Sequence, residues 1–395
     1  MKIYPNFHLA YCTNIHPGES WEETLGNLNQ YTLKVREKLC PQDQPFGIGL
    51  RLSAIAAKQL NQPKAMLGFQ RWLERHHCYV FTINGFPYGS FHSIPVKESV
   101  FAPDWQSQDR LAYTKLLFDI LVQLLPNELE GSVSTVPGSY KSFINHREQI
   151  DTIQDNLMAC LQHIDHLSKH YRKKLHLGLE PEPFGLIEST SETLEFFDQM
   201  RAVTDNDLVN SFLGINYDTC HMAIQFEDAF SSLTALTEKN IKISKIHLSS
   251  ALKVFPSLHG INHLMPFTDP VYLHQVVGKS PSGELHYWKD LDLAMQSDDQ
   301  WEEWRVHYHI PLHATPKNGL YSTIDQLRLT LDFLAINPLT CNHLEIETYT
   351  WHVLPASIKS KKVGEQIYQE YFWCLEEFSN RGLYQRSDRN LIESG

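Results

Sequence analysis

The chain has 395 residues, of which 42% are hydrophobic, and its 34 Lys and Arg against 46 Asp and Glu give a net charge of −12. This length accommodates one large barrel or two medium domains, and the acidic balance argues against a nucleic-acid partner because it repels phosphate backbones. There is no apolar leader, no apolar run near the length of about 18 residues that a membrane span needs, and no CxxC pair, so we expect a cytoplasmic protein with reduced thiols and no membrane span.

Short apolar runs alternate with amphipathic segments along the chain. The first helix pattern follows a capping box formed by Ser20 and Glu23, and its apolar residues recur at helical spacing. Further helices are predicted over 111–125, 144–167, 322–333 and 366–378. The predicted strands are, in chain order, 7–13, 46–52, 79–86, 131–137, 176–181, 214–219, 245–249, 306–312 and 343–348.

This alternation predicts the fold class. Strands that alternate with helices imply right-handed crossovers and a parallel sheet, and about eight such units favour a closed (β/α)8 TIM barrel, spanning residues 1–395 as one domain, over an open sheet. Nine strands are predicted, so one is surplus, either at the rim or wrongly assigned. The stretch 253–304, which prolines interrupt, is predicted to be a long insertion over the barrel mouth that serves as a lid or binding segment.

Polar residues end four of the later strands. Glu180, Asp218, His247 and Glu347 each close an apolar run, and the C-terminal ends of barrel strands open into one mouth. Three carboxylates and one imidazole suit Mn²⁺, Mg²⁺, Zn²⁺ or Co²⁺. Taken alone, each acid is as often a helix cap as a metal ligand, and His247 alone is as often a hydrogen-bonded core residue. The predicted metal site therefore depends on all four residues together. Glu345 shares a strand face with Glu347 and could replace it.

Short and long motifs then resemble known families. Residues 217–221, Tyr-Asp-Thr-Cys-His, resemble the Asp-Thr-Cys-His signature of endonuclease IV and, more broadly, the xylose isomerase-like barrel superfamily. Residues 11–21, 46–53 and 345–351 make the chain similar over nearly its whole length to the EboE family of bacterial metabolite-traffic proteins. That resemblance implies a small-molecule metabolite and partner proteins of the same pathway, and it names a pathway role rather than a reaction.

The superfamily resemblance implies a metal-dependent isomerase or epimerase that acts on a polyol-like metabolite. Glu180 and Glu347 would then take and return protons on opposite sides of the substrate, and His221 would bind a substrate oxygen or support the metal. From their spacing alone, His307, His309 and His313 would share one face of a strand, so His309 or His313 is a candidate for a further metal ligand and equally for a packed or solvated histidine. The candidates for substrate contacts are Arg51, Lys141, Glu182 and His313, of which the first two suit an anionic group. Arg51 is equally a candidate for a structural ion pair.

Two other functions stay open. A metal-dependent nuclease is disfavoured by the acidic balance and by the lack of a basic stripe. The segment after His247 also lacks the Asp-x-His pair of endonuclease IV. A non-catalytic binder that carries a metabolite to partner proteins would use the same metal without turnover.

Overall fold

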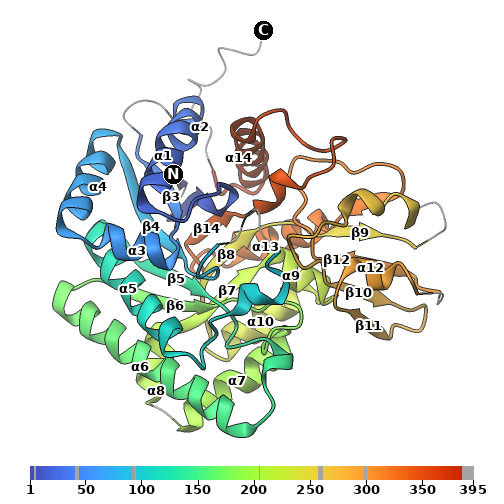
Figure 1. The fold of residues 1–395 in the computed structure, drawn as a ribbon, viewed down its shortest axis with the longest axis horizontal. Coiled ribbons are helices and arrows are strands. Elements are labelled where there is room, and N and C mark those ends of the chain that lie inside the picture. The colour runs from blue at the N-terminus through green and yellow to red at the C-terminus, as the bar shows by residue number, and fades with distance from the viewer. Residues whose placement is uncertain are drawn as a thin grey trace.

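The computed structural model describes residues 1–3, 6–40, 44–90, 92, 95–203, 205–256, 261–297 and 300–384. Eight parallel strands form a barrel at its centre (Figure 1). They run in the order β2-β14-β8-β7-β6-β5-β4-β3, and a parallel bridge between Cys12 and Gly49 joins the first to the last. The barrel strands are β2 (Phe7–Tyr11), β3 (Phe46–Arg51), β4 (Cys78–Asn84), β5 (Gly131–Thr135), β6 (Leu175–Leu179), β7 (Leu213–Asp218), β8 (Lys242–Leu248) and β14 (His343–Ile346), and the short β1 (Lys2–Ile3) pairs antiparallel with β2. The predicted TIM barrel is confirmed.

Helices surround the barrel (Figure 1). The predicted capping box is confirmed, since Ser20 accepts from the Glu23 amide while the Glu23 carboxylate bonds back to the Ser20 amide. The helices are α1 (Trp21–Asn27), the π-helical turn Leu28–Thr32, α2 (Leu33–Leu39), α3 (Ala54–Leu60), α4 (Pro63–Arg75), α5 (Gln108–Leu124), α6 (Arg147–Tyr171), α7 (Thr190–Val203), α8 (Asn206–Phe212), α9 (Thr219–Ile224), α10 (Ala229–Glu238), α12 (Leu291–Ala294), α13 (Ile324–Ile336) and α14 (Val363–Asn380). None of the helices in the described residues has the length and apolar character that a bilayer crossing requires.

A second, antiparallel sheet lies to one side of the barrel, at the right of Figure 1. Its order is β11-β10-β12-β9-β13, and the strands are β9 (Leu252–Val254), β10 (Val276–Lys279), β11 (Leu285–Trp288), β12 (Glu303–Val306) and β13 (Leu320–Ser322). The sheet therefore spans 252–322, beyond the predicted insertion of 253–304. Residues 257–260 and 298–299 of that prediction lie outside the described residues.

The predicted barrel strand at 306–312 is wrong. Only Val306 lies in a strand, and that strand, β12, belongs to the second sheet. The alternation in this run has another cause, because Val306, Tyr308 and Ile310 are buried in the apolar core of the inserted segment. Beyond β12 the backbone leaves the sheet, with the Ile310 amide donating to Ser250 O.

The barrel interior carries a polar layer below the mouth. Lys245 and Glu345 form a buried ion pair at 2.5 Å, and Lys245 also donates to the Ser134 hydroxyl at 3.1 Å. Gly49 leaves room for this layer, since a Cβ there would lie 1.8 Å from Glu345 Oε1. The interior therefore holds Glu345 at a fixed place beside the residues of the mouth.

Candidate metal centre

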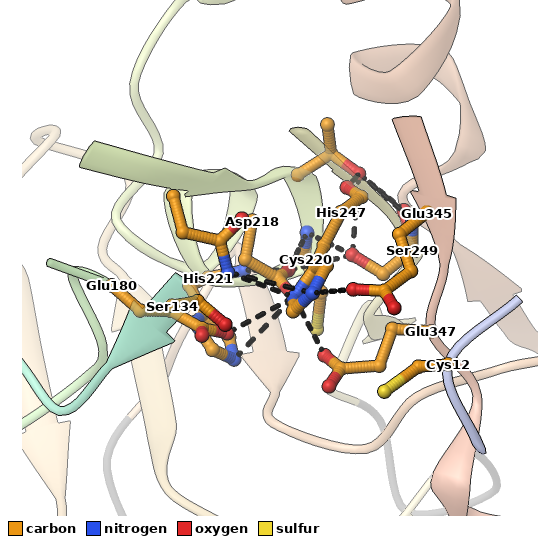
Figure 2. Close-up of polar contacts among 12 residues, drawn as sticks. Cys12, Ser134, Glu180, Asp218, Cys220, His221, His247, Ser249, Glu345 and Glu347 are labelled. Atoms are coloured by element: carbon orange, nitrogen blue, oxygen red, sulfur yellow. Dashed lines mark hydrogen bonds and ion pairs between the residues drawn. The ribbon is translucent and has the colours of Figure 1, made fainter. Parts of the chain in front are cut away.

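The barrel brings the four strand-end residues into one cluster, which we call the carboxylate cluster: Glu180, Asp218, His247 and Glu347. One ligand-type atom from each lies within 4.8 Å of the others. The strand register explains this, because Asp218 and Glu345 are the direct neighbours of His247 on either side. Figure 2 shows the carboxylates pointing toward the His247 ring from the surrounding strands.

The spacing in this cluster fits a divalent ion. His247 Nδ1 lies 3.1 Å from Glu180 Oε1, 3.3 Å from Asp218 Oδ2 and 3.0 Å from Glu347 Oε2. Donors bound at about 2.0–2.2 Å to one ion are about 3.0–3.5 Å apart, depending on the coordination number. These three distances suit atoms that share one coordination sphere, and they equally suit hydrogen bonds from a protonated His247 when no ion is bound.

The cluster also contains buried oxygens that lack partners. Glu180 Oε2 and Asp218 Oδ2 have no hydrogen-bond partner among the described residues, and both side chains are at most 3% exposed. Leaving a charged oxygen unsatisfied in the interior costs more than the ~1–3 kcal/mol of a neutral group. A cation would offset this cost and the mutual repulsion of the carboxylates, so the residues fit a metal.

Glu345 orients the histidine rather than joining the cluster. His247 Nε2 donates to Glu345 Oε2 at 2.8 Å, so a neutral ring presents the Nδ1 lone pair to the cluster. Burial alone would raise the pKa of Glu345, but the Lys245 ammonium and the His247 ring together outweigh it and hold that pKa at about 2. Of the two glutamates that the sequence left open, Glu347 therefore lies in the cluster.

Asp218 has two roles. Its Oδ1 accepts from the amides of Cys220 and His221 and from Ser249 Oγ at 2.6 Å, which caps α9. Its Oδ2 faces His247 at 3.3 Å. Burial would raise its pKa, but the imidazoles of His221 and His247 lower it well below the usual range. The capping role and the candidate ligand role thus coexist in one residue.

Two asparagines that the sequence interpretation missed position Glu347. Its Oε1 accepts from Asn14 Nδ2 at 2.8 Å and from Asn84 Nδ2 at 3.0 Å, which leaves Oε2 toward His247. Asn84 is the last residue of β4 and Asn14 follows β2. The strand-end argument used for the acids would have found both if it had been extended to amides.

The cluster opens into a cavity of about 510 Å³, a volume that includes space open to solvent. Glu182 and His221 line it, as predicted residues of the site, together with Tyr272, Leu273 and His307 from the inserted segment. Burial and the neighbouring carboxylates of Glu180 and Asp218 raise the pKa of Glu182 well above its usual value. The remaining lining residues are Asn14, Asn84, Phe86, Pro87, Val96, Lys97, Val100, Glu180, Glu347 and Tyr349.

Three of the predicted substrate contacts, Arg51, Lys141 and His313, are absent from the described lining of this cavity. Arg51 donates to the backbone oxygens of Gly18 and Gly89 and pairs with Glu19 at 3.2 Å. Lys141 pairs with Glu188 and with Glu192. His313 lies near Glu365 of α14 and is absent from the described cavity lining. The two cations are thus already neutralised by local carboxylates.

His309, which the sequence predicts as a metal ligand, lies close to one member of the carboxylate cluster. It is grouped with Asp218 and His221, rather than with the carboxylate cluster as a whole. Its Nδ1 bonds to the backbone oxygen of Glu347 at 2.8 Å. The segment 307–309 reaches the mouth from the inserted segment, which a strand-based prediction did not anticipate.

No protein-family model and no curated protein matches the sequence, but solved structures share its fold. A xylose isomerase domain protein from Alicyclobacillus acidocaldarius aligns over 95% of this chain and 99% of its own, with 12% identity and a TM-score of 0.51. Looser likenesses, each with a TM-score of 0.49, are the IOLI protein with a binding zinc atom (11% identity, 95% and 99% covered) and a xylose isomerase-like TIM barrel protein from Mycobacterium smegmatis in complex with magnesium (12% identity, 96% and 99% covered). The chain therefore has the xylose isomerase-like TIM barrel fold, while its similarity to the EboE family stays a prediction.

Proposed function

We propose that this protein is a metal-dependent isomerase or epimerase that acts on a small polyol-like metabolite. The observation that carries the proposal is that the carboxylate cluster opens into a cavity lined by polar groups. Glu180, Asp218, His247 and Glu347 would hold Mn²⁺, Zn²⁺, Mg²⁺ or Co²⁺. When bound, such an ion supplies Lewis acidity, which polarises a substrate oxygen and eases loss of a proton from the adjacent carbon.

The two glutamates would move that proton. Glu347 is fixed by the amides of Asn14 and Asn84 on Oε1, so its Oε2 keeps one orientation. Glu180 Oε2 has no hydrogen-bond partner among the described residues and is able to accept a proton. If one carboxylate takes the proton and the other returns it, the substrate is inverted or isomerised with no net proton change.

Other cavity residues would bind the substrate. Glu182 lies on the cavity wall, where its carboxyl group would hydrogen-bond a substrate hydroxyl. Asn14 and Asn84 line the same cavity. Of their remaining polar atoms, Asn14 Oδ1 has no hydrogen-bond partner among the described residues and would accept a bond from a substrate hydroxyl.

The pathway role belongs to the proposal as well. Similarity to the EboE family suggests a metabolite-traffic pathway in the cytoplasm, with proteins of that pathway as partners. Metal-dependent binding without turnover is the outcome that would favour a carrier instead.

The test is proton exchange at carbon. Protein loaded with each of the four metals is incubated in D₂O with a panel of ketoses, aldoses and ketocyclitols, and NMR follows deuterium uptake beside the carbonyl. We expect uptake with at least one substrate, and a loss of about 10²–10⁴-fold in Glu347→Gln, the range that general-base catalysis supplies. Lys141→Ala, on a residue outside the cavity, serves as the control. Full activity in Glu347→Gln would overturn the assignment.

A further inference from the structure

The cavity that opens from the carboxylate cluster has a lining of two kinds. Its polar part includes the carboxylates of Glu180 and Glu347, which follow barrel strands. The other part is hydrocarbon, and we call it the apolar wall: Phe86, Pro87, Val96, Val100 and Leu273. Because both parts line one cavity, a ligand that reaches the carboxylates and fills the cavity also contacts the wall.

The apolar wall joins two distant parts of the chain. Four of its residues lie between β4 and α5, whereas Leu273 lies in the inserted segment, before β10. The amides of Val96 and Lys97 both donate to the backbone oxygen of Val271, at 2.9 Å and 3.3 Å. Val96 also packs with Tyr272 in one buried apolar cluster. These contacts hold the inserted segment against the connection between β4 and α5, so the wall is formed from both.

The polar groups beside the wall are already bonded. The Tyr272 hydroxyl lies 2.7 Å from His92 Nδ1. Lys97 is the only Lys or Arg in the described lining of the cavity, and it donates to Asp290 Oδ2 at 2.6 Å and to the backbone oxygen of Asp269 at 3.3 Å. An anionic group would therefore find this ammonium already paired. A hydroxyl placed against the wall would lose its bonds to water and gain little in return, whereas an apolar group would leave water favourably.

The wall is also shielded from water. Phe86, Val96 and Leu273 are only 6–7% exposed. The Phe86 ring packs against the buried ring of Phe101, with the two centroids 5.6 Å apart. The cavity volume of about 510 Å³ lies within the range of about 300–1,000 Å³ found for pockets that bury a small ligand. It therefore has room for an apolar group beside the oxygens that would reach the carboxylates.

We propose that the substrate is amphipathic. One end carries the adjacent hydroxyl and carbonyl oxygens that would face the carboxylate cluster, and the other end is an uncharged hydrocarbon group, such as an aromatic ring, that contacts the apolar wall. Leu273 and Val96 are then specificity-determining residues, because a polar side chain at either place would favour a fully hydroxylated sugar instead. This inference rests on the proposed function only for the oxygen-bearing end of the substrate.

The test compares two probes that share a hydroxymethyl ketone. Dihydroxyacetone carries a second hydroxymethyl group where 2-hydroxyacetophenone carries a phenyl ring. Their dissociation constants for the metal-loaded full chain are measured by isothermal titration calorimetry and by ligand-observed NMR. We expect the phenyl compound to bind at least about 10-fold more tightly, which is the lower end of what an apolar pocket discriminates.

Two variants locate this preference at the wall. Leu273→Asn keeps the approximate size of the side chain but makes it polar, and it should weaken binding of the phenyl compound at least about 10-fold relative to dihydroxyacetone. Val96→Thr adds a hydroxyl to a side chain of the same shape, should act in the same direction, and carries the test if Leu273→Asn does not fold. Circular dichroism checks folding.

The matched control is Leu293→Asn. It makes the same change in the same inserted segment, at a residue that is 47% exposed and outside the described lining of the cavity. The ratio of the two affinities should stay as in the wild type.

The outcomes separate this inference from the proposed function. Binding needs no turnover, so a phenyl preference that Leu273→Asn removes would support the amphipathic substrate even if no compound exchanged deuterium. Deuterium exchange with sugars, together with equal affinities for the two probes, would support the isomerase and overturn the amphipathic substrate. An unchanged ratio of affinities in both Leu273→Asn and Val96→Thr would also overturn it.

Discussion

The carboxylate cluster lies beside a group of three histidines, His221, His307 and His309, whose rings contact one another, but the chain builds the two groups differently. The first comes entirely from the ends of four barrel strands, whose convergence is a property of any parallel barrel. The second takes His221 from the barrel and His307 and His309 from an irregular segment of the insertion. The barrel fold by itself determines where the strand ends lie. The position of an irregular segment such as 307–309 depends on how the insertion packs against the barrel.

The largest stability effect is expected below the carboxylate cluster, at the buried Lys245–Glu345 pair. Glu345→Leu leaves Lys245 unpaired in the interior, and breaking a buried pair in this way costs about 3–5 kcal/mol. It also removes the acceptor of His247 Nε2, which should weaken metal binding about 10–100-fold. Urea unfolding of the chelated protein and a zinc titration measure the two effects.

A matched control separates the cost of the unpaired Lys245 charge from the loss of the contact that orients His247. The double variant Lys245→Met/Glu345→Leu should recover most of the lost stability, because it buries no lone charge, but its metal binding should stay weak. If Glu345→Leu binds metal as the wild type does, Glu345 does not orient His247.

A smaller effect on the free energy of unfolding is expected at Glu370, a buried carboxyl group that has no cationic partner among its hydrogen bonds. Glu370 is buried with only neutral partners, Thr348 Oγ1 and the Leu312 amide, and burial raises its pKa from 4.5 to about 7. Because the unfolded chain loses this proton first, Glu370 lowers the free energy of unfolding as pH rises from about 4.5 to 7, by about 3 kcal/mol in total at 1.36 kcal/mol per unit.

The stability of Glu370→Gln relative to the wild type is therefore expected to increase as the pH rises across that interval. Chemical unfolding at pH 5 and pH 8 measures the difference between the two proteins. An unchanged difference at the two pH values would show that Glu370 is not held protonated in the folded chain.

Removal of the bound metal by a chelator should lower the free energy of unfolding by an amount similar to, or slightly smaller than, the effect expected at Glu370. An ion present at 100 times its dissociation constant adds about 2.7 kcal/mol to the free energy of unfolding. Removing it leaves the carboxylate cluster without its counter-charge. Thermal melts with and without chelator, in the wild type and in His247→Ala, should show a smaller shift in the variant, and equal shifts would place the stabilising ion elsewhere.

The sequence predicted the carboxylate cluster because Glu180, Asp218 and Glu347 each end a strand, and the C-terminal ends of parallel barrel strands converge at one mouth. It left Arg51 open between a substrate contact and a structural ion pair, because the ion pair with Glu19 depends on a loop contact that periodicity does not encode. It misassigned 306–312 as a barrel strand, because alternating apolar residues show that one side of a segment is buried but not whether the barrel core or another core covers it. Asn14 and Asn84 were missed because only charged residues were weighed.

The smallest effect on stability is expected at Lys141, which does not line the described cavity. Lys141 is 38% exposed where it pairs with Glu188 and Glu192, and such surface pairs contribute about 0–1 kcal/mol. Lys141→Ala should therefore leave metal content unchanged and lower stability by no more than that, as measured by urea unfolding. A loss of bound metal in this variant would extend the site beyond the barrel mouth.

The central claim is that residues distant in the chain hold one ion at the barrel mouth. Crystals of the full chain grown with MnCl₂ or ZnCl₂ test it through anomalous scattering at the metal edge. The account predicts an anomalous peak within bonding distance of Glu180, Asp218, His247 and Glu347. A fully metal-soaked crystal with no peak between these side chains would contradict it.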